Sequence, residues 1–159
     1  MYKNILVPLD GSELAECVLP HVESIAKGCE TQNVVFLRVA EPLHMPGGVR
    51  GIYFSDEDIK RADSENRAAA ENYLKNLVNR TKYNNVKVQS EVIIGKVYKS
   101  AAEDVADYAT KNEVDLIVIA THGRSGVSRW AWGSVADRIL RSACVPVMMI
   151  RAPGCIPGM

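Results

Sequence analysis

Short apolar runs alternate with longer amphipathic segments along the sequence. The apolar runs are typical of buried β-strands. The segments between them repeat apolar residues at intervals of three and four positions, as one face of an α-helix does. Pro20 lies inside the first such segment and is expected to kink a helix there. The predicted strands are residues 5–9, 34–39, 86–92, 116–119 and 146–150, and the predicted helices are residues 14–25, 57–82, 97–108 and 134–141.

This order of elements predicts an α/β fold. Because helices lie between successive strands, the strands are expected to be parallel, with helices on both faces of the sheet. Residues 116–119 are the most apolar strand, as expected for the middle of a sheet, whereas residues 86–92 alternate in polarity, as in an edge or half-exposed strand. The pattern therefore predicts a doubly wound, open five-stranded parallel sheet of the Rossmann-like kind.

Length and composition restrict the class of protein. A chain of 159 residues fits one domain, predicted over residues 1–151, with residues 152–159 as a flexible tail. The 19 basic and 19 acidic residues balance, which argues against nucleic acid as a partner. We find no signal peptide and no apolar run long enough for a membrane, so no membrane partner and a cytoplasmic location are expected. The four cysteines lack metal-site spacing, and no metal site is predicted.

The loop after residues 116–119 carries the strongest chemical signal. Open parallel sheets bind ligands beyond the carboxyl ends of their strands, where this loop begins. Gly123 and Gly126 allow backbone N–H groups to turn inward, and Gly133 precedes a helix whose first N–H groups are unpaired. These features predict a phosphate site, although glycines also occur there for turn geometry alone. Neither the P-loop motif nor the dinucleotide fingerprint is present.

Several polar residues near this loop have a structural alternative to a ligand contact. Asp10 suits a ribose hydroxyl or a base amine, but also a helix N-cap or an Asx turn. His122 suits a phosphate or a hydrogen bond within the loop. Arg124 suits a terminal phosphate or bulk solvent. Ser134 suits a phosphate or, together with Asp137, a capping box.

Three parts of the chain resemble one known family. Residues 2–12, Tyr-Lys-Asn-Ile-Leu-Val-Pro-Leu-Asp-Gly-Ser, are similar to the first strand of the universal stress protein (UspA) family. Residues 121–129 and 133–136 are similar to the ATP-binding loop of that family, and residues 144–147 to the entry of its last strand. The likeness covers nearly the whole chain in the same order, and it implies the fold of the adenine nucleotide alpha hydrolases.

The ATP-binding members of this family carry the motif G-x2-G-x9-G-[ST]. Gly123, Gly133 and Ser134 match the motif, and Ala120 stands at the position of its first glycine. The resemblance implies that ATP or AMP binds at the carboxyl ends of the strands, with any Mg²⁺ held only through the phosphates. The implied binding residues are Pro8, Leu9, Asp10, Val39, Ala120, Thr121, His122, Gly123, Arg124, Ser125, Gly126, Gly133, Ser134, Val135 and Ala136.

Three functions are compatible with these residues. The leading hypothesis is a regulatory stress-response protein in which an adenine nucleotide orders residues 41–56. The second is slow ATP hydrolysis, although no water-activating carboxylate lies beside the loop in sequence and no catalytic residue is predicted. The third is a dimerising scaffold that does not use nucleotide. The resemblance implies a homodimer through the last strand, from Pro146 to Ile150, and an exposed edge strand there favours pairing.

Overall fold

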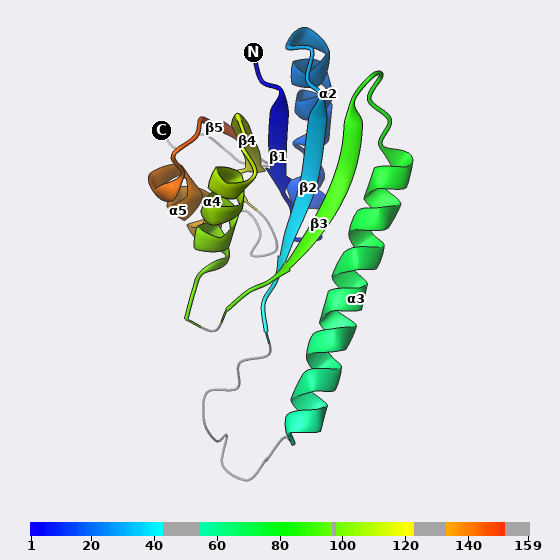
Figure 1. The fold of residues 1–159 in the computed structure, drawn as a ribbon, viewed down its shortest axis with the longest axis vertical. Coiled ribbons are helices and arrows are strands. Elements are labelled where there is room, and N and C mark those ends of the chain that lie inside the picture. The colour runs from blue at the N-terminus through cyan, green and yellow to red at the C-terminus, as the bar shows by residue number, and fades with distance from the viewer. Residues whose placement is uncertain (43–54, 97, 123–132, 152–159) are drawn as a thin grey trace.

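The computed structural model describes residues 1–42, 55–96, 98–122 and 133–151 of the chain. Five parallel strands form one open sheet in the order β3-β2-β1-β4-β5 (Figure 1). The predicted doubly wound architecture is confirmed, with β3 and β5 at the two ends of the strand order. The strands are β1 Asn4–Pro8, β2 Asn33–Ala40, β3 Lys87–Ile94, β4 Leu116–Ala120 and β5 Val147–Ile150.

Two layers of helices cover the sheet because successive strand residues face opposite sides. In β1, Ile5 and Val7 belong to the core shared with the first three helices, whereas Leu6 belongs to the core shared with the last two. Every residue of β4 is buried, as the apolar run over residues 116–119 predicts. The helices are α1 Glu13–Glu16, α2 Leu19–Gly28, α3 Asp56–Arg80, α4 Ala101–Lys111 and α5 Ser134–Ser142.

The first predicted helix is divided into two. α1 ends at Glu16, and α2 begins at Leu19 with Pro20 in its first turn. A proline inside a helix clashes with the carbonyl group four residues earlier, which here belongs to Glu16. In the first turn of a helix its missing amide hydrogen costs nothing. The expectation of one kinked helix is therefore wrong, and Pro20 starts a new helix instead.

Capping boxes determine where α3 and α4 begin. The Asp58 N–H donates to Ser55 Oγ at 3.1 Å, and the Asp58 carboxylate accepts a hydrogen bond from the Ser55 N–H. Ser100 and Glu103 form the same reciprocal pair before α4. α4 thus begins at Ala101 and not at the predicted position 97, because a capping box fixes a helix start more sharply than apolar spacing does.

α5 begins without the predicted capping box. Gly133 is the N-cap residue and Ser134 is the first helical residue, so the Ser134 side chain makes no capping hydrogen bond. The Asp137 carboxylate instead accepts from Arg141 Nε at 3.0 Å. The prediction placed the cap one residue too late, since Gly133 already has the extended ψ of 134° that a cap residue requires. The first N–H groups of α5 consequently have no side-chain cap.

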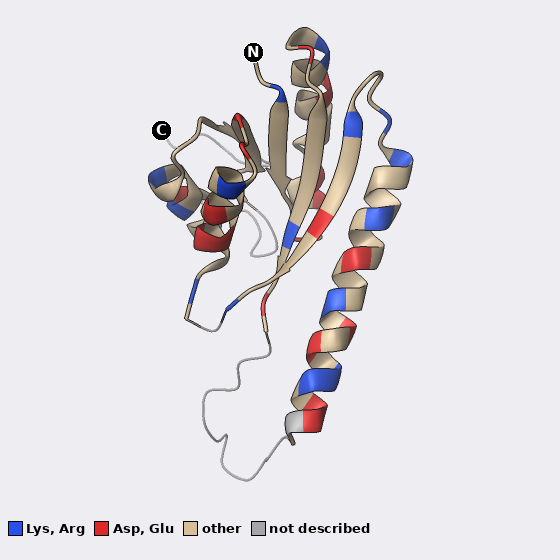
Figure 2. Ribbon diagram, in the orientation of Figure 1, with Lys and Arg blue, Asp and Glu red and all other residues tan. Residues whose placement is uncertain are grey.

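Charged residues of both signs occur along the helices (Figure 2). Basic and acidic residues alternate along α3, while β1 and β4 contain neither. Among the described helices, none combines the length and the apolar character needed to cross a bilayer.

Tyr83 links the end of α3 to the start of α2. Its side chain is buried, and its hydroxyl donates to the Leu19 carbonyl oxygen at 3.2 Å. Burial, followed by the nearby charge of Glu23, raises the pKa of Tyr83 to about 12. An unfolded tyrosine ionises near pH 10. The stabilisation from the neutral hydroxyl is therefore complete below about pH 10 and is lost as the pH rises towards 12.

We expect Tyr83→Phe to lower the free energy of unfolding by about 1 kcal/mol near neutral pH, because one hydrogen bond is lost. The same variant should lose less stability than the wild type between about pH 10 and 12, since its ring does not ionise. Urea unfolding across this range measures both effects. Tyr98→Phe is the control because Tyr98 is 84% exposed. If Tyr83→Phe and the wild type lose stability equally between about pH 10 and 12, the raised pKa assigned to Tyr83 is wrong.

Candidate functional site

The candidate site lies where the winding direction of the sheet reverses. β1 pairs with β2 on one side and with β4 on the other, so the segments that follow these strands diverge. Such divergence leaves a crevice beyond the carboxyl ends of the strands, where ligands of open α/β sheets bind. A cavity of about 550 Å³ occupies this position. Its volume is within the range of small-molecule sites.

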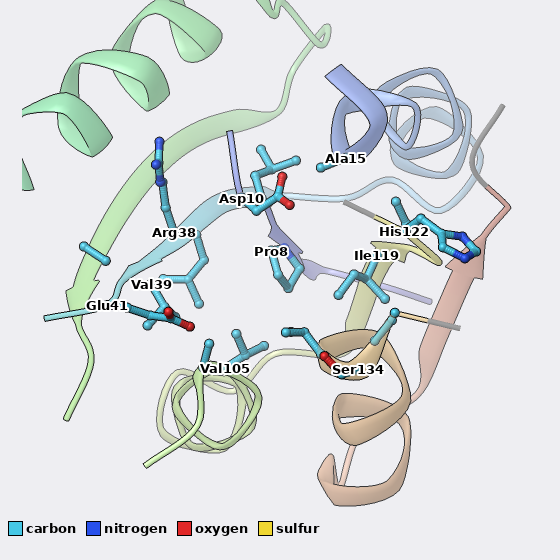
Figure 3. Close-up of a pocket in the computed structure, with 18 of the residues that line it drawn as sticks. Pro8, Asp10, Ala15, Arg38, Val39, Glu41, Val105, Ile119, His122 and Ser134 are labelled. Carbon is cyan, nitrogen blue, oxygen red and sulfur yellow. The ribbon is translucent and has the colours of Figure 1, made fainter. Parts of the chain in front are cut away.

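The cavity has an apolar floor and a polar margin. Pro8 of β1 and Ile119 of β4 lie in its centre, with Val105 of α4 beside them (Figure 3). The polar side chains lie around them and come from segments far apart in sequence. These side chains are Asp10, Arg38, Glu41, Asn66, Thr121, His122 and Ser134.

The turn after β1 is held by its own polar groups. Asp10 Oδ1 accepts hydrogen bonds from the Ser12 N–H at 2.9 Å and from the Ser12 hydroxyl at 2.7 Å, which defines an Asx turn. Ser12 caps α1, because its Oγ accepts from the Ala15 N–H at 3.2 Å. Of the alternatives for Asp10, the Asx turn is present and the N-cap is not. Asp10 nevertheless lines the cavity.

Backbone hydrogen bonds join the end of β4 to the start of α5. The Gly133 N–H donates to the Thr121 carbonyl oxygen at 2.8 Å, and the Thr121 N–H donates to the carbonyl of Ile150 at 2.8 Å. Thr121 Oγ1 and His122 Nδ1 lie 2.9 Å apart, so His122 has the hydrogen bond that was its structural alternative. This connection places the uncapped N-terminus of α5 at the cavity, where its partial positive charge suits an anion.

The structure brings the predicted site residues that it describes to this one cavity. Gly123, Arg124, Ser125 and Gly126 lie outside the described residues, as does most of the expected loop at positions 41–56. The predicted site requires its residues to lie together, and the described ones do. Their contact with a nucleotide stays a prediction. The predicted site residues that line the cavity are Pro8, Leu9, Asp10, Val39, Ala120, Thr121, His122, Gly133, Ser134, Val135 and Ala136.

Sequence reasoning missed the parts of the wall that come from α3 and α4 and, apart from Val39, the part that comes from β2. Asn66 of α3 lines the cavity and donates to the Glu41 carbonyl oxygen at 3.0 Å. Helical periodicity indicates which face of α3 is buried. It does not indicate that Asn66 reaches Glu41, just beyond the end of β2. Val105 lies within the predicted helix of residues 97–108, and its apolar spacing indicates a buried face but not a cavity. Arg38 had an available signal, since an arginine inside an otherwise apolar strand is unusual.

Comparison with known proteins establishes the family. The sequence model of the universal stress protein family matches residues 1–151. The universal stress protein MJ0577 of Methanocaldococcus jannaschii is 26% identical over an alignment of 161 positions, which covers 95% of this chain and 96% of that protein. The chain therefore belongs to the universal stress protein family.

Solved structures of related proteins have the same fold. The MJ0577 structure matches 97% of this chain and 99% of its own, with a TM-score of 0.80 and 24% identity. A universal stress protein from Archaeoglobus fulgidus in complex with dAMP matches 94% of this chain and 98% of its own, with a TM-score of 0.52 and 25% identity. An Arabidopsis thaliana family member with AMP bound matches 96% and 93%, with a TM-score of 0.63 and 18% identity.

Close packing at Gly133 generates a testable prediction about the connection between β4 and α5. A Cβ atom at Gly133 would lie 2.9 Å from the Thr121 carbonyl oxygen. We expect Gly133→Ala to lower the free energy of unfolding by about 1–3 kcal/mol, because the methyl group must displace backbone. Urea unfolding near neutral pH measures this change.

The matched control for this substitution is Gly28→Ala at the end of α2. A Cβ atom there meets nothing within 4 Å. Since alanine is a better helix former than glycine, Gly28→Ala should be neutral or slightly stabilising. Equal stability of the two variants would show that α5 does not depend on close approach to Thr121.

Proposed function

We propose that this chain is a regulatory stress-response protein that binds an adenine nucleotide, ATP or AMP, in the cavity beyond β1, β2 and β4. The order of chemical groups along the cavity carries the proposal. An apolar centre lies between the turn that contains Asp10 and the uncapped N-terminus of α5. A nucleotide has the matching order of an apolar base, a hydroxylated ribose and anionic phosphates.

The base and ribose fit the part of the cavity formed by β1 and β2. Val39 and Pro8 offer apolar surface to an adenine ring, and Val105 adds to it from α4. The Asp10 carboxylate lines the cavity in the turn after Pro8 and accepts hydrogen bonds, and a ribose hydroxyl is a suitable donor. The apolar contacts supply binding energy, while the few polar groups orient the ligand.

The phosphates fit the part of the cavity formed by β4 and α5. Ser134, Val135 and Ala136 form the first turn of α5 and line the cavity, and no side chain caps their N–H groups. Such N–H groups bind phosphate oxygens directly. Gly123, Arg124, Ser125 and Gly126 complete the proposed site from the loop after β4. In this proposal any Mg²⁺ is bound through the phosphates.

Related proteins support the choice of ligand. The Archaeoglobus fulgidus protein is in complex with dAMP, and the Arabidopsis protein has AMP bound. Both have the fold of this chain, and both ligands carry adenine and a phosphate group. An adenine nucleotide is therefore the ligand class that we assign to the cavity.

We further propose that the chain acts as a homodimer of its 1–151 domain in the cytoplasm. β5 is at one end of the strand order, and Met148 within it is 39% exposed. A second copy of the strand would satisfy this edge through a two-fold axis. Native mass spectrometry of freshly purified protein reads the oligomeric state and any retained nucleotide together.

A charge placed at the start of α5 tests the phosphate position. Ser134→Glu adds a carboxylate where a helix dipole favours it, so helix stability should be kept or increased. The same carboxylate repels phosphates, and ATP affinity should fall at least about tenfold. Adenosine, which lacks phosphates, should bind with little change. Isothermal titration calorimetry measures both affinities.

Ser142→Glu is the matched control, because it makes the same charge change at the other end of α5, away from the cavity. It should leave ATP affinity unchanged. Unaltered ATP affinity in Ser134→Glu would overturn the phosphate position. Absence of both retained and titrated nucleotide in the wild type would overturn the proposed function and favour a scaffold that does not use nucleotide.

A further inference from the structure

Arg38 is unusual because it is a basic residue on β2, an inner strand of the sheet. It is 9% exposed, and no other lysine or arginine in the described part of the chain is buried. A guanidinium group stays charged throughout the physiological range. Burying such a charge is costly unless the surroundings compensate for it. The position of this side chain therefore has to be explained by the groups packed around it.

The groups packed around the Arg38 guanidinium include an aromatic ring and the turn after β1. The guanidinium lies over the ring of Tyr73 from α3, 5.5 Å from the ring centroid, which is a cation–π arrangement. The guanidinium also packs against Gly11. A Cβ atom at Gly11 would lie 2.8 Å from Arg38 Nη1 and 3.2 Å from Arg38 Cζ. Gly11 has a φ of +87°, a conformation that other residues rarely adopt. The guanidinium thus packs against the backbone of the turn after β1.

That turn carries Asp10. The Asx turn uses Asp10 Oδ1, and both Asp10 and Arg38 line the cavity. Figure 3 shows Arg38 extending on the same side of the cavity as Asp10, away from Ser134. Because Gly11 has no side chain, the turn has little packing of its own at this point. The flat guanidinium supplies that packing from β2.

We propose that Arg38 is a positioning residue for ribose recognition, which holds the Asp10-Gly11-Ser12 turn so that the Asp10 carboxylate meets a ribose hydroxyl. The inference rests on the proposed function. Arg38 acts through Asp10 and makes no ribose contact itself. Its loss lets the turn relax and removes the preference for a ribonucleotide over the corresponding deoxynucleotide. A residue that merely supports the fold would weaken all nucleotides alike.

The test compares ATP with 2′-deoxy-ATP and 3′-deoxy-ATP by isothermal titration calorimetry. The wild type should bind ATP about tenfold more tightly than at least one deoxy analogue, as expected for a hydrogen bond to a carboxylate. Asp10→Asn and Arg38→Met should each reduce that ratio to about twofold or less. The double variant should show the same ratio as either single variant, because both substitutions remove one contact.

Arg80→Met is the matched control. Arg80 pairs with Glu16, and Glu16 accepts a hydrogen bond from the Tyr73 hydroxyl at 2.9 Å, so Arg80 belongs to the same side-chain cluster. Its side chain is 58% exposed and does not line the cavity. The ribose-to-deoxyribose ratio of Arg80→Met should equal that of the wild type. A reduced ratio in this control would overturn a specific role for Arg38.

If Arg38→Met does not fold, Arg38→Lys provides the same test. Lysine keeps the charge but has no planar group to rest on Gly11, so the ratio should again fall to about twofold or less. A wild-type ratio in either Arg38 variant overturns the positioning role while the proposed function stands. A wild type that binds ATP without discrimination also overturns it. A wild type that binds no nucleotide overturns the proposed function itself.

Discussion

The parallel pairing of β1 with β4 at the centre of the sheet is the constraint on which the rest of the structure depends. The chain winds from β1 to β2 and β3 on one side, and then places β4 and β5 on the other. The segment after β1 leads to one face of the sheet, and the segment after β4 leads to the other. Neither segment therefore covers the carboxyl ends of these two adjacent strands. The cavity beyond Pro8 and Ile119 is a direct result. The apolar character of both strands stabilises this pairing, since each is buried on both faces.

The two ends of the cavity are built by different means. At the α5 end, the hydrogen bond from the Gly133 N–H to the Thr121 carbonyl fixes where the helix starts. Within the part of the chain that the structure describes, no side chain caps the first N–H groups of α5, which are the groups we propose for an anion. At the β1 end, the Asx turn of Asp10 and the buried Arg38 restrict the backbone by side-chain packing. This chain thus combines the start of α5, where we propose that an anion binds, with a turn supported by side chains.

Local rules and tertiary rules agree over most of the fold. Apolar runs identified β1, β2, β4 and β5, and the alternating polarity of residues 86–92 identified β3 as an edge strand. The errors fall at helix starts. Pro20 divides a segment whose apolar spacing continues across it, and Ser100 with Glu103 starts α4 later than the spacing suggests. In each case a single cap or proline contributes more to the boundary than several weakly periodic positions do.

The sequence by itself determined the strands, their parallel arrangement and the residues at their carboxyl ends, because each depends on local composition and on short-range spacing. The sequence therefore predicts one site that contains Asp10, Val39, Thr121 and the start of α5. Only the tertiary structure decided which other side chains meet there. Asn66 reaches the Glu41 carbonyl across the fold, and Arg38 rests on Gly11 from a neighbouring strand. Such contacts depend on how elements distant in sequence are packed, and helix or strand periodicity contains no information about their partners.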